Sequence, residues 1–202
     1  PGYADSPQRD PDQDGFTNFE EFKAETNPSD HKDHPPLIGK LKCAELDKNP
    51  FMITYTSDNV LGAIKEGDKF KFRYQAIIDG KRLNINSDFI EAGKGAASTF
   101  FADGPAQLRF ELKNVEQRNE RNPRSGLEET NTYAILEDVS ATKKGDNHEI
   151  KKGSRNGKVI RDFVGNLYLD AIGESTNIVK VPERTRFSLP LDPDAADKPY
   201  LF

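Results

Sequence analysis

Tryptophan is absent from this chain of 202 residues, cysteine occurs once, and histidine occurs three times. The single Cys43 excludes a disulfide within the chain and any Cys-x-x-Cys metal or redox site. Because Cys43 lies in the alternating stretch 41–46, we expect it to be a small core side chain and not a reactive thiol.

Catalytic motifs are also missing. The nucleophile motif Gly-x-Ser-x-Gly does not occur. The segment Gly153–Val159 is one residue too short for a phosphate loop, so we expect a hairpin with its turn at Asn156-Gly157. His148 falls in a predicted turn, which makes it a poor member of a catalytic triad. We therefore expect a protein that is not an enzyme, although the paired carboxylates of a hydrolase meet only in three dimensions.

No hydrophobic run approaches the length that crosses a bilayer, and the sequence starts at Pro1 without methionine. This start is compatible with a signal peptide or membrane anchor lost upstream of Pro1. The net charge of −5 is unevenly distributed, because residues 1–34 hold nine Asp/Glu and three Lys/Arg and therefore carry −6. The remainder carries +1 and is electrically mixed, which argues against a nucleic-acid-binding surface.

One acidic stretch, residues 10–21 (DPDQDGFTNFEE), combines residue types and spacing that specify a chemistry. It matches the 12-residue calcium loop of an EF-hand, in which Gly15 takes the sharp turn. Ca²⁺ is a hard cation that takes about six to eight oxygen ligands at flexible angles. The predicted ligands are the side chains of Asp10, Asp12, Asp14, Asn18 and Glu21 and the backbone carbonyl of Phe16.

The surroundings of this loop indicate a static site. Phe16 to Thr26 is expected to form a short amphipathic exit helix that Asn27-Pro28 stops. Gly2 and Pro7 exclude an entering helix, so we expect a single structural calcium clip with a Kd of about 10⁻⁴ to 10⁻³ M. The alternative is an acidic, solvated linker that contains this pattern by chance.

Two other polar clusters are poorer metal candidates. His31, Asp33 and His34 lie between prolines that prevent the helix a zinc site would need there. The aspartates of the tail imitate a second calcium loop but lack its glycine and its distal glutamate.

From Leu37 onward the pattern is that of short strands. The clearest is 69–78, where aromatic and aliphatic residues alternate with polar ones, and Asp79-Gly80 predicts a type I′ hairpin into 81–86. A turn is expected at 47–50 and a long exposed loop at 113–129. About ten strands without crossover helices predict a mainly β fold, an antiparallel β-sandwich or partly open barrel. The expected divisions are 1–36 (calcium loop, helix and linker), 37–189 (β domain) and 190–202 (irregular tail).

Residues 10–30 (DPDQDGFTNFEEFKAETNPSD), followed by 34–57 (HPPLIGKLKCAELDKNPFMITYTS), carry a family resemblance. Together they resemble the periplasmic part of type IV pilus-like system proteins from envelope operons of Verrucomicrobia-type bacteria. The loop alone is also similar to dockerin-like and thrombospondin-3-like repeats of bacterial surfaces. The resemblance implies a membrane-anchored, non-catalytic component of a pilus-like or secretion-like assembly, with calcium at the six loop residues.

Our leading hypothesis is thus a periplasmic or cell-surface protein whose partners are other assembly components or further copies of itself. A second hypothesis is a carbohydrate- or matrix-binding module that uses tyrosines such as Tyr55 or Tyr74. The alternation that places Tyr74 inward, and the missing tryptophan, count against it. A hydrolase is the third.

Overall fold

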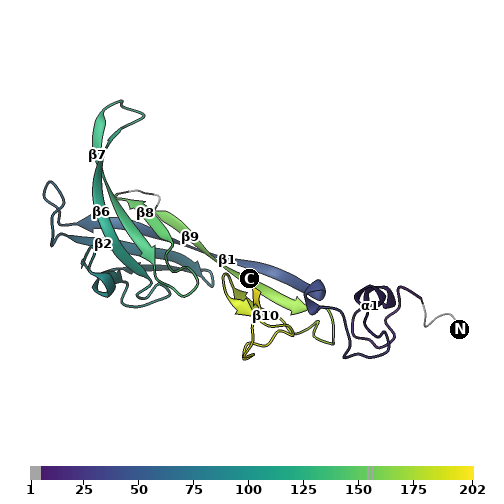
Figure 1. Ribbon diagram of the computed structural model, residues 1–202. Coiled ribbons are helices and arrows are strands. Elements are labelled where there is room, and N and C mark those ends of the chain that lie inside the picture. The colour runs from purple at the N-terminus through teal and green to yellow at the C-terminus, as the bar shows by residue number, and fades with distance from the viewer. Residues whose placement is uncertain (1–5, 154, 156) are drawn as a thin grey trace. The chain divides into compact units, whose positions relative to one another are not determined.

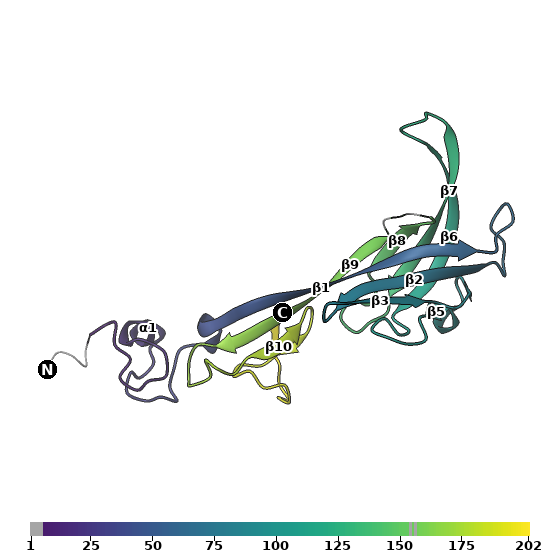
Figure 2. The same ribbon diagram turned by 180° about the vertical axis from the view of Figure 1, so that it is seen from behind.

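The computed structural model describes residues 6–153, 155 and 157–202. It is mainly β with antiparallel sheets, which confirms the predicted class of a β-sandwich or partly open barrel (Figures 1 and 2). The chain divides into two compact units. The terminal unit combines the chain up to Lys48 with Asp162–Phe202, and the central unit is Asn49–Arg161. Residues of the predicted β domain 37–189 therefore fall in both units.

The described residues form one α-helix, two short 3-10 helices and twelve strands. The helices are α1 (Asn18–Ala24), η1 (Leu37–Lys40) and η2 (Gly95–Ser98). The first six strands are β1 (Leu41–Asp58), β2 (Lys69–Ile78), β3 (Lys81–Asn86), β4 (Ile90–Glu91), β5 (Thr99–Phe100) and β6 (Phe110–Arg121). The others are β7 (Glu128–Asp138), β8 (Asn147–Lys151), β9 (Lys158–Leu169), β10 (Val179–Pro182), β11 (Arg186–Phe187) and β12 (Tyr200–Leu201).

The central unit is a sandwich of two sheets. One sheet has β1, β2 and β3 in order with β4 beside β2, and the other has the order β5-β6-β7-β8. The inward faces meet in one core, and alternate residues of each strand reach it. This core is rich in aromatic rings in stacked, tilted or edge-on contact: Phe51, Tyr55, Phe70, Phe72, Tyr74, Phe100, Phe101 and Phe110.

The β2–β3 hairpin forms as the sequence predicts. Inward and outward residues alternate along β2, and Ile78 pairs with Lys81 across the two-residue turn. Asp79 and Gly80 both have positive φ, 50° and 72°, as a type I′ turn requires. Local turn chemistry therefore sets the register of this hairpin.

The predicted turn at 47–50 is wrong, because β1 runs without interruption from Leu41 to Asp58. The pairing of β1 with β2 begins only at Phe51. Pro50, which has no N–H to donate, therefore interrupts no hydrogen bond between these two strands. Cys43 is exposed, not a core residue, and its thiol lies 3.2 Å from the Glu45 carbonyl. Residues 42–46 are exposed on both faces of the strand, so alternation there marks no core.

The expected loop at 113–129 is also wrong. β6 extends to Arg121, and from Asn114 onward it pairs residue by residue with β7, which begins at Glu128. Polar cross-strand pairs hold this ribbon, and Glu120 accepts hydrogen bonds from Tyr133 and Asn131. A polar ladder thus forms where composition alone suggests a loop (Figure 1).

His148 lies in strand β8 and not in the predicted turn. It is half-buried, pairs with Leu136, and meets the Phe110 ring edge-on at 6.0 Å. Burial lowers the pKa of its imidazole. In the hairpin predicted around Asn156-Gly157, Asn156 lies outside the described residues.

In the terminal unit, β10 pairs with β9 and β11 pairs with β12. Strand β12 gives the predicted irregular tail one short regular element. Gly165 pairs with Val181 in regular register, and it makes room for the Phe202 ring: an added Cβ would lie 2.6 Å from that ring. One apolar cluster of this unit comprises Leu167, Val181, Phe187 and Leu191. The other comprises Phe16, Leu37, Leu169 and Ala171.

Candidate metal centre

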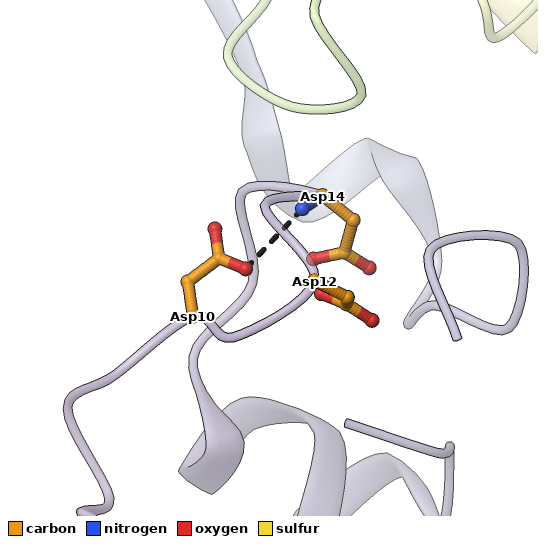
Figure 3. A group of neighbouring side chains, drawn as sticks. All are labelled: Asp10, Asp12 and Asp14. Carbon is orange, nitrogen blue, oxygen red and sulfur yellow. Dashed lines mark hydrogen bonds between the residues drawn. The ribbon is translucent and has the colours of Figure 1, made fainter. Parts of the chain in front are cut away.

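Asp10 organises the acidic loop. Its Oδ1 accepts hydrogen bonds from the backbone N–H groups of Gln13 at 2.7 Å and Asp14 at 3.2 Å, and its Oδ2 accepts one from Gly15 at 2.8 Å. The chain can turn back on this carboxylate because Gly15 adopts a φ of +93°. Figure 3 shows the result, a tight loop with the carboxylates of Asp12 and Asp14 beside each other.

The exit helix begins directly after the loop. Thr17 and Glu20 form a capping box, which starts α1 at Asn18. The helix ends at Ala24, before the Thr26 expected from the sequence, because Glu25 takes a left-handed conformation with a φ of 59°.

A turn takes the place of an entering helix: the Arg9 N–H donates to the Ser6 carbonyl at 3.0 Å. The turn is bound to the start of α1 by three hydrogen bonds, in which the Asn18 amide nitrogen donates to the Ser6 carbonyl at 2.9 Å. The backbone N–H groups of Asn18 and Phe19 donate to the carbonyls of Arg9 and Pro7. Both sides of the acidic loop are thereby tied to one short helix.

The three predicted aspartate ligands come together. One carboxylate oxygen from each of Asp10, Asp12 and Asp14 lies within 4.8 Å of the others. Among the described residues this is the one group of three or more potential metal ligands. Glu21 lies outside that group, but its side chain is fully buried, as is that of Asp14.

Several buried carboxylate oxygens of the acidic loop have no hydrogen-bond partner in the described part of the chain. They are both carboxylate oxygens of Asp12, both of Glu21, and Oδ2 of Asp14. Burial of a carboxylate without partners costs desolvation free energy, and proteins rarely contain one unless a cation or a hydrogen-bond donor compensates it. Five such oxygens in one twelve-residue loop therefore fit the coordination shell of a cation.

The electrostatics of the cluster also fit a bound cation. Burial raises the pKa of Glu21 to about 7, and the charges of Asp12, Asp14 and Asp10 add to the rise. Burial also raises the pKa of Asp12, with Asp14 as the next cause. Among the described residues, the charges that act on Glu21 and Asp12 are those of other carboxylates, and a divalent ion would supply positive charge there.

The remaining predicted ligands occupy suitable places in the chain. Asn18 is the first residue of α1 and half-buried. Phe16 is buried, and its N–H donates to Asp14 Oδ1 at 2.8 Å. The roles of the Asn18 side chain and the Phe16 carbonyl as ligands stay predictions. Away from the loop, His34 stacks on the Phe16 ring at 6.0 Å, and its Nδ1 lies 2.9 Å from the Pro35 carbonyl.

Sequence reasoning missed the residues that hold the loop from outside. The N–H of Ile172 donates to the Asp14 carbonyl at 2.7 Å, and Ala171 packs directly against Gly15. Both follow β9, near the opposite end of the chain. Gly15 was the one available signal, since a glycine can mark a close approach of another backbone.

Comparison with known proteins identifies no relative. No family model matches the chain, and neither a curated protein nor a solved structure resembles it significantly. None of the helices in the described residues has the length and hydrophobicity to span a bilayer.

Proposed function

We propose that this chain is a non-catalytic periplasmic or cell-surface component of a pilus-like or secretion-like assembly, with residues 10–21 closed by a structural calcium ion. The observation that carries the calcium part is the full burial of Asp14 and Glu21, whose Oδ2 and two carboxylate oxygens have no hydrogen-bond partner among the described residues. When bound, the ion supplies the positive charge that lets these carboxylates remain close together and buried.

The donor set favours calcium over other common ions. Carboxylate, amide and carbonyl oxygens suit hard cations, whereas structural zinc prefers cysteine and histidine. Magnesium usually retains several waters and demands near-octahedral geometry, which does not suit a loop that encloses its carboxylates. Calcium accepts a flexible arrangement with a bidentate carboxylate, the role that Glu21 would take at the last loop position.

Isothermal calorimetry on the chelator-stripped protein tests this site. We expect one calcium site with a Kd of about 10⁻⁴ to 10⁻³ M. Asp14→Asn and Glu21→Gln should abolish it, because each removes a buried ligand charge while keeping the side-chain shape. Asp30→Asn is the matched control, since Asp30 is exposed and outside the loop. Absence of binding up to about ten times the upper Kd would contradict the calcium proposal.

The assembly part rests on the family resemblance and is supported by an exposed apolar groove beside the calcium loop. This groove of about 500 Å³ lies between α1 and the segments on either side of it, and Phe22 on its wall is 79% exposed. Its lining is Pro7, Pro11, Asn18, Phe19, Phe22, Pro28 and Ser29. Exposed apolar patches of this kind favour a protein partner.

Sedimentation of the full chain with calcium tests whether that partner is a second copy. Phe22→Asp should then lower the association constant, while Leu61→Asp, at a 91% exposed position in the central unit, should not. A monomer at all concentrations would leave other assembly proteins as the proposed partners. Tyr55 and Tyr74, the tyrosines named for the carbohydrate-binding alternative, are buried and offer no platform for a sugar. That alternative stays a prediction.

A further inference from the structure

Three consecutive loop residues belong to the candidate metal centre and to a packing contact at the same time. The Asp14 carboxylate is a candidate ligand, while its carbonyl accepts the N–H of Ile172 at 2.7 Å. Gly15 makes the sharp turn of the loop, and a Cβ on it would lie 2.8 Å from the Ala171 Cα. The loop backbone therefore fits the segment after β9 with no room for a side chain between them.

Phe16 extends this contact into an apolar cluster. Its ring is 3% exposed and shares the cluster with Leu37, Leu169 and Ala171. Lys40 lies over the ring at 4.9 Å and pairs with Glu20 at 2.8 Å. The end of β9 is thus packed against the same residues that set the geometry of the acidic loop.

We propose that calcium binding and the docking of residues 14–16 on residues 169–172 are one coupled equilibrium. This rests on the calcium site proposed above. Calcium holds Asp12, Asp14 and Glu21 in the closed arrangement, and only that arrangement presents the Asp14 carbonyl and the Phe16 ring to the strand end. Without the ion, the crowded buried carboxylates favour opening of the loop, which releases both contacts.

Coupling of this kind is reciprocal, so the docked strand end must also raise the calcium affinity. Residues far outside the twelve-residue loop, with no oxygen offered to the metal, then help to set the Kd. A metal site that merely neutralises its own loop would not respond to them.

Two leucines on β9 provide a matched test. Leu169 is fully buried in the cluster with Phe16, whereas Leu167 is 3% exposed in the other cluster of the same unit. Leu169→Ala should weaken calcium binding at least about fivefold, the lower end of typical coupling. Leu167→Ala removes an equal side chain from the same strand and should leave the Kd within about twofold. Phe16→Ala keeps its backbone carbonyl and should act like Leu169→Ala.

Hydrogen exchange on the unsubstituted protein tests the reverse direction. Adding calcium should slow exchange of the Ile172 N–H, while the Gly93 N–H, bonded to the Leu112 carbonyl in the central unit, should not change. Since this measurement needs no variant, it decides the question even if a leucine variant fails to fold.

The outcomes separate the two proposals. No calcium binding to the unsubstituted protein removes the proposed site itself. Calcium binding with equal affinity in both leucine variants, or with unchanged exchange at Ile172, retains the site and overturns the coupling.

Discussion

Arg109 and Asp138 form a buried ion pair in which Nε and Nη2 of the guanidinium lie 2.9 and 2.7 Å from the same carboxylate oxygen. The Asp138 side chain is fully buried and that of Arg109 is 12% exposed. The guanidinium also lies over the rings of Phe51 and Phe110, so the pair forms part of the aromatic core of the central unit.

This pair gives the central unit a dependence on pH. Burial alone would raise the pKa of Asp138, but hydrogen bonds from Arg109 and Ser140 outweigh it and lower the pKa below its ordinary 3.8. A carboxyl with a lowered folded pKa stabilises the fold above the unfolded pKa, and this contribution is lost as pH falls through the folded pKa. Urea unfolding should therefore show stability falling below about pH 4.

Asp138→Asn should cost about 3 kcal/mol at pH 7, because it leaves a mostly buried guanidinium without its counter-charge. The variant should also show a smaller loss of stability between pH 4 and pH 3. Asp103→Asn, at an exposed position, should change stability by less than about 0.5 kcal/mol. Equal pH profiles for Asp138→Asn and the unsubstituted protein would show that this pair is not the cause.

Gly15→Ala should destabilise the docked loop for two reasons, its φ of +93° and the clash with Ala171. Gly145 is a close control, because its φ is +91° and nothing lies within 4 Å of an added Cβ. Both variants should lose about 1 kcal/mol or more from backbone strain alone. Only Gly15→Ala should also weaken calcium binding measured by calorimetry, so equal affinities in the two variants would argue against the clash.

Calcium should stabilise the terminal unit by mass action. At 100 times its Kd the ion adds about 2.7 kcal/mol to the unfolding free energy of whatever it closes. Thermal unfolding should be measured with and without chelator and monitored by a probe in the terminal unit, such as a label on Cys43. It should show this increase in the unfolding free energy. Magnesium at the same concentration is the control, and an equal effect would point to general screening of the acidic loop.

Cys43 itself should react in the folded protein, since it is exposed on β1. Its rate with a chromogenic disulfide reagent should be similar with and without urea, and Cys43→Ser should change stability by less than about 0.5 kcal/mol. Reaction only after unfolding would instead favour the core position that alternation predicted.

The ribbon of β6 and β7 should resist proteolysis along its strands. Arg118 lies in the ladder opposite Asn131, while Arg124 is exposed in the turn between the strands. Limited trypsin digestion followed by mass spectrometry should find cleavage after Arg124 well before cleavage after Arg118. Equal rates at the two sites would favour the exposed loop that composition predicted.

The parts that the sequence predicted well are those governed by neighbours in the chain. The clustering of Asp10, Asp12 and Asp14 arises within one loop, and Asp79-Gly80 fixes the β2–β3 register through its own backbone preferences. The errors at 47–50 and 113–129 arose because polar and turn-forming residues also fit strands: β1 runs through 47–50, and polar residues of β6 and β7 pair across a local hairpin. The contact of Ile172 with Asp14 is non-local, and Gly15 is its one local sign.

The division of the chain into units also has a consequence for the order of folding. The central unit is continuous in sequence, whereas the terminal unit needs both ends of the chain. During synthesis, Asn49–Arg161 is complete before Leu169 and Ala171, two of the residues that pack against the Phe16 ring, have been made. We therefore expect the acidic loop, although translated before the central unit, to reach its final position after that unit has folded, and a nascent chain that stops before Leu169 to leave that ring exposed to chaperones.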